Sequence, residues 1–343
     1  MTTASDPVLS VRELTAVFDL PSGAATAVDS VSFDIAAGET LGLVGESGSG
    51  KSVTALSIVR LLRAPGRVSG GHVRFEGQDL RRLDDKDMRA VRGRKIGFVF
   101  QEPMTALDPV YTVGAQIVEA LEVHGLARGA AARSRAIELL EAVRIPGAAT
   151  RLDDYPHQLS GGMRQRVCIA IGIACRPRLL IADEPTTALD VTIQAEILDL
   201  LRDMRQRLGL AMLLISHDLG VIAETADHVA VMYAGRIVEQ GPVRDVLRDP
   251  QHPYTRGLLA SRPGGAHGNR LQPIEGAVPL LGSFPSGCAF HPRCPARLDV
   301  CASAVPGPIR TAPDRMVRCF LHDPHHRHTA AAAARSSEDD GAR

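Results

Sequence analysis

A run of eight residues combines glycines, a lysine and hydroxyl groups in a spacing that can hold phosphate. The residues are Gly45, Glu46, Ser47, Gly48, Ser49, Gly50, Lys51 and Ser52, and they match the pattern G-x-x-x-x-G-K-S. Glycines let backbone N–H groups wrap one anion, and a following helix presents its positive end to the same phosphates. Lys51 can reach the β- and γ-phosphates, and the Ser52 hydroxyl can bind Mg²⁺. The pattern predicts a site for a nucleoside triphosphate.

Two adjacent carboxylates, a glutamine and a histidine supply the groups that hydrolysis needs. Asp183 and Glu184 follow an apolar run, so Asp183 can hold the Mg²⁺ shell and Glu184 can act as general base on a water. Gln101 and His217 also follow apolar runs, at the carboxyl ends of strands where ligands bind in open α/β sheets. We expect Gln101 to touch Mg²⁺ or the attacking water, and His217 to contact the γ-phosphate.

A second anion-binding nest is predicted at Ser160, Gly161 and Gly162, where a helix begins. One chain hardly needs two phosphate cradles for one nucleotide. Two chains packed head to tail would place each nucleotide between the loop of one chain and the Ser-Gly-Gly of the other.

Strands and helices alternate along the elements that must position these groups. Period-two or continuous apolar runs predict strands over 8–18, 28–35, 40–44, 95–100, 179–182 and 210–216. Helices are predicted over 51–62 and 193–208, and residues 112–174 form a helical insertion without a convincing strand. This order favours an α/β core with a mostly parallel sheet.

Composition excludes several classes of protein. The 343 residues carry a formal net charge of zero, with 3% aromatic residues and no Trp, which argues against a nucleic-acid-binding surface. The sequence has neither a long apolar run nor a basic, apolar leader, so we expect a protein made and kept in the cytoplasm. In the reducing cytoplasm we expect the six cysteines to be free thiols or metal ligands and not disulfides.

Taken together, the motifs resemble those of the ATPase subunit of an ATP-binding cassette (ABC) transporter, over residues 8–240. In that family's terms, 45–52 is the Walker A loop, 159–163 the signature and 179–184 the Walker B strand. Gln101 is the Q-loop residue, Asp190 belongs to the D-loop and His217 is the switch histidine. The signature has Met163 where Gln is usual, and the D-loop begins Thr187-Ala188 rather than Ser-Ala, but neither change removes a group that touches phosphate. Phe18 matches the residue that stacks adenine, although a core-facing Phe is an equal alternative.

The resemblance implies a P-loop ABC cassette at 7–260, with a parallel core sheet, an antiparallel β subdomain and a helical subdomain at about 110–176. It also implies ATP and Mg²⁺ as ligands. A small irregular cysteine-containing extension is expected at 261–322 and a disordered tail at 323–343.

Residues 100–109 and 287–295 resemble the dipeptide and oligopeptide importer branch, which also includes importers of nickel, glutathione and other small solutes. The branch implies a second ATPase subunit, expected to be a paralogue, two transmembrane permeases and an extracytoplasmic solute-binding protein. It implies a peripheral position on the cytoplasmic side of the inner membrane, and no nucleic acid. One alternative is a soluble cassette ATPase acting on DNA or ribosomes. Such proteins with one cassette per chain need a long coiled coil between the Walker A and Walker B motifs, and the gap between 52 and 179 is too short for one. Another alternative is a redox-sensing ATPase.

Four late cysteines form a candidate metal set. Cys288, Cys294, Cys301 and Cys319 have the spacing C-x5-C-x6-C-x17-C, which lacks the paired C-x2-C of most structural zinc sites. Four thiolates on irregular loops suit a [4Fe–4S] cluster, and members of the peptide branch with this pattern hold one. Zinc and free thiols are the alternatives. A metal centre would act mainly as a staple in a segment with little core.

Overall fold

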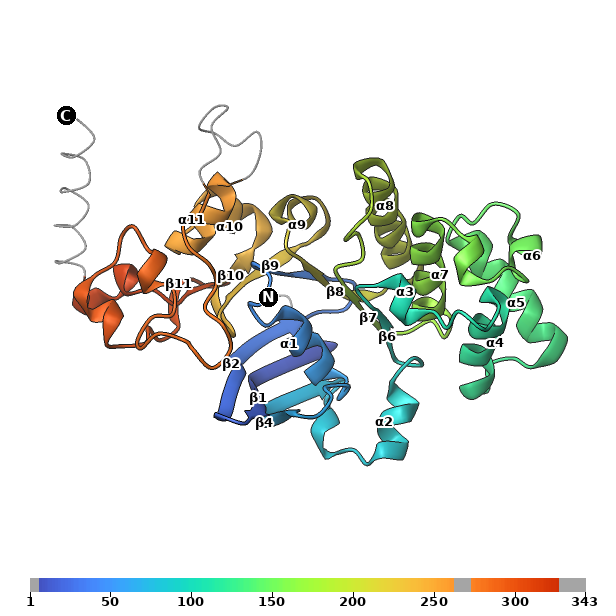
Figure 1. Ribbon diagram of the computed structural model, residues 1–343, viewed down its shortest axis with the longest axis horizontal. Coiled ribbons are helices and arrows are strands. Elements are labelled where there is room, and N and C mark those ends of the chain that lie inside the picture. The colour runs from blue at the N-terminus through green and yellow to red at the C-terminus, as the bar shows by residue number, and fades with distance from the viewer. Residues whose placement is uncertain (1–5, 262–272, 327–343) are drawn as a thin grey trace.

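The computed structural model describes residues 6–261 and 273–326 (Figure 1). At its centre is an eight-stranded sheet with the strand order β11-β12-β10-β9-β3-β8-β7-β6. The strands are β3 (Thr40–Val44), β6 (Ile96–Val99), β7 (Leu179–Asp183), β8 (Ala211–Ser216), β9 (His228–Tyr233), β10 (Arg236–Pro242), β11 (Ile309–Ala312) and β12 (Arg315–Val317). From β6 to β9 the neighbouring strands run parallel, which confirms the predicted α/β core.

Alternate side chains of the central strands enter two different cores. Leu179 and Ile181 of β7 face one core and Leu180 faces the other, as a period of two requires. The first core includes α1 (Lys51–Ile58), and the second includes α7 (Gly161–Ile173), α8 (Val191–Leu208) and α9 (Leu219–Thr225). Both faces of the parallel strands are therefore covered, which explains their continuous apolar sequences.

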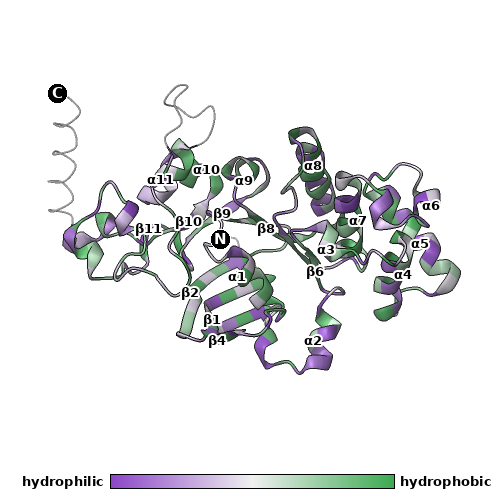
Figure 2. Cartoon of the chain, in the orientation of Figure 1, coloured by the Kyte–Doolittle hydropathy of each residue, from purple (hydrophilic) through white to green (hydrophobic). Residues whose placement is uncertain are grey.

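A second, antiparallel sheet packs with α1 and has the order β2-β1-β4-β5. Its strands are β1 (Leu9–Leu20), β2 (Gly23–Ile35), β4 (Gly66–Phe75) and β5 (Gln78–Asp79). Polar and apolar bands alternate along β1 in Figure 2, because one face is buried and the other is more open. This sheet confirms the antiparallel subdomain. β1 and β2 extend beyond the predicted ends, since their pairing continues to the turn between Leu20 and Gly23.

A helical subdomain is inserted between β6 and β7. It comprises α3 (Pro103–Ala106), α4 (Val113–Val123), α5 (Gly129–Ala142), α6 (Ala148–Arg151) and α7, while α2 (Asp85–Val91) precedes β6. The helices begin at Pro103, earlier than the expected boundary near 110, because a proline is well suited to a first helical turn. The expected helix 51–62 is shorter in the structure. It ends at Ile58, and Arg60 takes a left-handed φ of 54°.

The C-terminal extension joins the main sheet, which the sequence did not predict. After α10 (Val243–Arg248) and α11 (Pro253–Ala260), residues 273–326 form short helical turns and the β11–β12 hairpin. β12 pairs with β10 through Glu239 and Val317. Arg315 donates a hydrogen bond of 3.1 Å to Glu239, which is 1% exposed. The disordered tail is expected to begin at 323, but Pro324–His326 form a short 3-10 helix, and the rest of the tail, from 327 onward, lies outside the described residues. Within the described ranges, no helix is long and apolar enough to cross a membrane.

Protonation of His252, the residue that caps the N-terminus of α11, should destabilise the fold at low pH. This residue is 1% exposed, and its Nδ1 accepts a hydrogen bond of 3.0 Å from the backbone N–H of Tyr254, which requires a neutral ring. Burial lowers the pKa of His252 to about 3, so its stabilising contribution is complete above about pH 6.5 and falls as the pH drops toward 3. Below pH 6.5 we expect the free energy of unfolding to fall by about 1.4 kcal/mol per pH unit from this group.

The measurement is urea unfolding between pH 7 and 4.5 for the wild type and His252→Asn. Asparagine can still cap the helix but does not titrate. The difference in unfolding free energy between the two proteins should shrink as the pH falls. Parallel curves would contradict the assignment.

Candidate active site

The phosphate loop connects the buried strand β3 to the N-terminus of α1. Gly48 and Gly50 have φ angles of 80° and 103°, values that favour glycine, and they let the loop turn back on itself. Lys51 is 4% exposed, and its Nζ donates to the backbone oxygens of Gly45 at 2.8 Å and Glu46 at 3.1 Å. Burial lowers the pKa of Lys51, and the nearby carboxylates oppose this shift. The loop thus holds one cation at the start of a helix, as a phosphate site requires.

The carboxylates at the end of β7 reach the same point. The Ser52 hydroxyl donates to Asp183 Oδ1 at 3.0 Å, although the two residues are 131 positions apart. Burial raises the pKa of Asp183 to about 6, and the adjacent Glu184 adds to the shift. The half-buried Ser52 hydroxyl and the buried Asp183 carboxylate are the oxygen donors that Mg²⁺ prefers, so both residues fit the predicted metal role.

Glu184 is the point on which the predicted catalytic groups converge. Its Oε2 lies 3.2 Å from Gln101 Nε2 and 3.2 Å from His217 Nδ1, and its Oε1 lies 3.7 Å from Lys51 Nζ. Glu184 has a φ of 47°, an uncommon backbone conformation for a residue with a side chain. The structure therefore brings together Lys51, Gln101, Glu184 and His217. Sequence reasoning did not predict that Thr187 donates to Glu184 Oε2 at 2.9 Å.

A pocket of about 290 Å³ opens beside these groups. Its lining includes the polar residues Lys51, Ser52, Gln101 and Glu184, and Phe18 is among its apolar residues. Phe18 is half-buried and lines the pocket, as the adenine-stacking interpretation expects. Leu281 and Phe284 of the extension also line it, which sequence reasoning missed. No local motif could reveal Leu281 and Phe284, because they lie more than 200 residues after the phosphate loop in the sequence.

Comparison with known proteins identifies the family. The family model "ABC transporter" matches residues 28–187, and the model "Oligopeptide/dipeptide transporter, C-terminal region" matches residues 238–301. The dipeptide transport ATP-binding protein of Escherichia coli is 49% identical, over 91% of this chain and 96% of its own length. The protein of the same name from Bacillus subtilis is 49% identical, over 94% and 97%. The chain belongs to the ABC transporter ATPases of the dipeptide/oligopeptide importer family.

A solved structure supports the fold of this cassette. A dimeric ATP-binding cassette in a post-hydrolysis state with ADP and phosphate is 28% identical, with a TM-score of 0.62 over 69% of this chain and 99% of that one. The match leaves part of the chain uncovered, and the second family model matches residues near its C-terminal end. The two family models thus match separate parts of this ABC ATPase, 28–187 and 238–301.

The signature of the cassette lies away from the pocket of its own chain. Ser160 caps α7, and its Oγ accepts from the backbone N–H of Met163 at 3.3 Å. Asp190 caps α8 in the same way, accepting from Ile193 at 2.9 Å. Neither Ser160, Gly161 and Gly162 nor Asp190 lines the 290 Å³ pocket. Ser160, Gly161 and Asp190 are exposed, so the N-termini of α7 and α8 are open to solvent.

The four late cysteines of this ABC ATPase share one module. Cys301 and Cys319 are buried, Cys288 and Cys294 are half-buried, and the backbone N–H of Cys288 donates to Cys301 at 2.8 Å. Burial raises the pKa of Cys294 to about 11 and of Cys319 to about 12, and the neighbouring thiols add to both shifts. Within 6–261 and 273–326, however, no group of three or more ligating side chains is arranged to hold a metal ion. The geometry thus does not support the predicted cluster or zinc site.

Proposed function

We propose that this chain binds Mg-ATP in the 290 Å³ pocket and hydrolyses it to energise an importer of di- or oligopeptides. The observation that carries the ATPase proposal is the convergence of Lys51, Gln101 and His217 on Glu184. The peptide substrate rests on the relatives named above and on the C-terminal family model. Importers of nickel, glutathione or another small solute are the alternative within the same machinery.

Each group in the site has a distinct task. Lys51 and the loop amides bind the triphosphate, with the positive end of α1 favouring the same charge. Ser52 and Asp183 would hold Mg²⁺, with Gln101 as a further oxygen donor, and the metal would neutralise charge on the phosphates. Glu184 accepts the proton of the attacking water. His217 can donate to the γ-phosphate, and Thr187 helps to orient the Glu184 carboxylate.

A second cassette completes each site. The signature residues Ser160, Gly161 and Gly162 and the nearby Asp190 face away from their own pocket, and Val191 is 84% exposed beside them. Apolar exposure of this degree next to a helix N-terminus fits an interface that a second ATPase subunit would cover. We propose that ATP is held between the loop of one subunit and the signature of its partner, which would be a paralogue.

The permeases would contact the cassette at an apolar patch that follows Gln101. We define this docking patch as Met104, Val110 and Tyr111, which are 58%, 70% and 57% exposed. It lies where the helical subdomain begins, only a few residues after Gln101, so a shift of Gln101 on nucleotide binding would reach it through the chain. Two transmembrane permeases and an extracytoplasmic solute-binding protein would complete the importer, with this chain peripheral on the cytoplasmic side of the membrane.

Co-purification from native membranes tests the proposal. The tagged wild type should bring down two multi-span proteins, a second cassette and a solute-binding protein. The double variant Met104→Asp/Tyr111→Asp should lose the multi-span proteins but keep ATP binding. Leu280→Asp, at a residue that is 78% exposed outside the helical subdomain, is the matched control and should retain them. Ribosomal or DNA-bound partners without a permease would reject transport and favour a soluble ATPase.

We further propose a [4Fe–4S] cluster on Cys288, Cys294, Cys301 and Cys319, with zinc as the alternative. The support is the set of donors and not their arrangement: the four thiols belong to one small module, and besides burial the other three thiols raise the pKa of Cys319. Thiols must ionise to bind metal, and a bound cation would supply that driving force. Iron, sulfide and zinc analysis of the same purified complex tests this proposal. Absence of all three would leave four free thiols.

A further inference from the structure

The C-terminal extension is attached directly to the phosphate loop. Arg293 donates to both carboxylate oxygens of Glu46, at 2.7 and 3.0 Å, and its side chain is only 6% exposed. The guanidinium lies 5.8 Å from the ring centre of Tyr233 and also donates to the backbone oxygen of Glu275 at 2.8 Å. A bidentate, partly stacked arginine is the geometry in which this side chain holds a partner most rigidly.

The second attachment to the loop comes from α11. The backbone N–H of Glu46 donates to the Tyr254 hydroxyl at 2.8 Å, and Tyr254 is fully buried. Backbone and side chain of one loop residue are therefore both held by segments beyond residue 250. The other loop contacts described above are those of Lys51 within the loop and those of Lys51 and Ser52 with Glu184 and Asp183 at the end of β7.

The same extension supplies a wall of the nucleotide pocket. Leu281 and Phe284 line it together with Phe18, Lys51 and Glu184. Gly282, between them, lies over the β1–β2 hairpin: a Cβ there would be 3.8 Å from side-chain atoms of Leu20 and of Ala25. The segment thus lies against the β1–β2 hairpin that carries Phe18.

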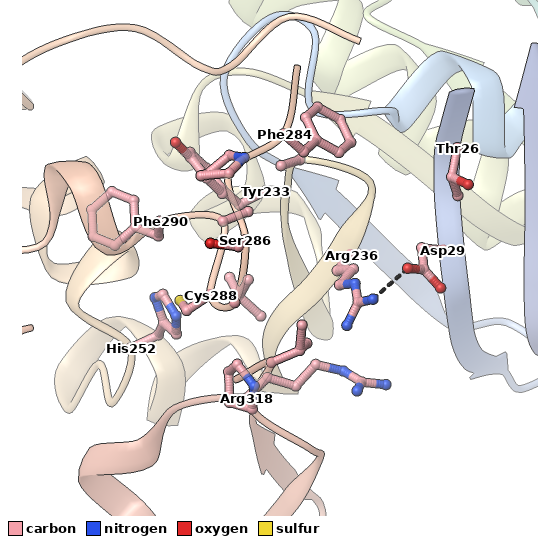
Figure 3. Close-up of a pocket in the computed structure, with 17 residues that line it drawn as sticks. Thr26, Asp29, Tyr233, Arg236, His252, Phe284, Ser286, Cys288, Phe290 and Arg318 are labelled. Atoms are coloured by element: carbon pink, nitrogen blue, oxygen red, sulfur yellow. Dashed lines mark hydrogen bonds and ion pairs between the residues drawn. The ribbon is translucent and has the colours of Figure 1, made fainter. Parts of the chain in front are cut away.

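Phe284 also connects this pocket to the cysteine module. It lines a neighbouring pocket of about 300 Å³ between the cassette and the extension. Figure 3 shows Phe284 on the side of this pocket nearer Thr26, whereas Cys288 lies near His252. Only Pro285, Ser286 and Gly287 separate Phe284 from Cys288 along the chain.

The combination of apolar and charged side chains in the pocket fits a nucleotide, which has a planar base and charged phosphates. The large apolar side chains of the pocket are Phe18, Leu281 and Phe284, and its charged side chains are Lys51 of the phosphate loop and Glu184. We infer that Leu281 and Phe284 bind the base of ATP together with Phe18, and that Arg293 positions the phosphate loop through Glu46. This inference rests on the proposed ATP site. It makes the extension a part of the nucleotide site as well as an appendage to the cassette.

The test compares ATP with inorganic tripolyphosphate, which has the phosphates but no base. Binding of each to the full chain is measured by titration calorimetry with Mg²⁺. Leu281→Ala and Phe284→Ala should each weaken ATP binding, the latter by about tenfold, since contact of an aromatic ring with a base is worth about 1–3 kcal/mol. Neither should change tripolyphosphate binding. Leu280→Ala, at the exposed neighbouring residue, is the matched control and should change neither ligand.

Three results would overturn the base-binding role. Equal weakening of both ligands would indicate a merely structural effect, unchanged ATP binding would remove the contact, and tighter ATP binding would mean that the segment obstructs the pocket. Lys51→Ala separates this inference from the proposed ATP site. If that variant loses ATP while the extension variants do not, only the inference fails. If it binds ATP normally, the site itself is wrong.

The role of Arg293 has its own readout. Arg293→Met and Glu46→Gln should each weaken ATP and tripolyphosphate several-fold, because the loop holds the phosphates. The double variant should be no weaker than either single variant, since both changes break one interaction. Additive losses would contradict positioning through Glu46.

Discussion

Glu184→Gln should retain Mg-ATP binding and lose most turnover, by about 10²–10⁴-fold, the usual contribution of a general base. The amide is isosteric with the carboxylate, and it can still contact Gln101, Thr187 and His217, which surround this side chain. It cannot take the proton of the attacking water. Binding is measured by calorimetry, and turnover by phosphate release from the assembled complex.

Glu224→Gln is the control for that experiment. It removes the same charge from an exposed residue of α9 outside the pocket, and it should leave turnover unchanged. Wild-type hydrolysis by Glu184→Gln would reject the assigned base. Loss of ATP binding in that variant would instead mean that Glu184 has a structural role through its contact with Lys51.

Lys51→Ala should weaken ATP binding by about 100-fold or more. Removal of one partner from a desolvated charge pair costs about 2–5 kcal/mol, and every 1.4 kcal/mol is a tenfold change in affinity. Lys51 meets this condition because it is 4% exposed at the phosphate end of the pocket. The loss should appear equally with tripolyphosphate, because Lys51 acts on the phosphates and not on the base.

Lys95→Ala is the matched control for Lys51→Ala. Lys95 is about half exposed and pairs with Glu76 at 3.7 Å, and exposed pairs contribute little. Its loss should leave ATP affinity within error of the wild type. Circular dichroism of both variants checks that they are folded. Wild-type ATP affinity of a folded Lys51→Ala would place the nucleotide elsewhere on the chain.

The local motifs of this protein were predictable from sequence because their geometry is set over a few residues. The loop from Gly45 to Ser52 places its lysine at the start of α1 wherever the strand and helix are formed. Gln101, Glu184 and His217 follow β6, β7 and β8, and these strands are neighbours or near neighbours in the parallel sheet. Side chains at the carboxyl ends of parallel strands meet at one edge, so their convergence could be expected from strand order alone.

The role of Phe18 and the extent of the strands depended on pairing that spacing does not show. The sequence allowed two positions for Phe18, in the hydrophobic core or against the adenine base of ATP. The structure places it at the pocket, because β1 remains paired with β2 as far as Leu20. The cysteine spacing was compatible with a cluster, but ligation depends on distances between loops, and within the described residues no ligating group is formed.

The tertiary structure alone decided how the extension meets the site. Arg293 reaches Glu46 across 247 residues, and Leu281 and Phe284 enter the pocket beside Phe18. These contacts have no local spacing because they arise from packing of the extension on β10 and on the β1–β2 hairpin. Short-range patterns therefore determined which groups do the chemistry, whereas long-range packing decided which other groups surround the nucleotide.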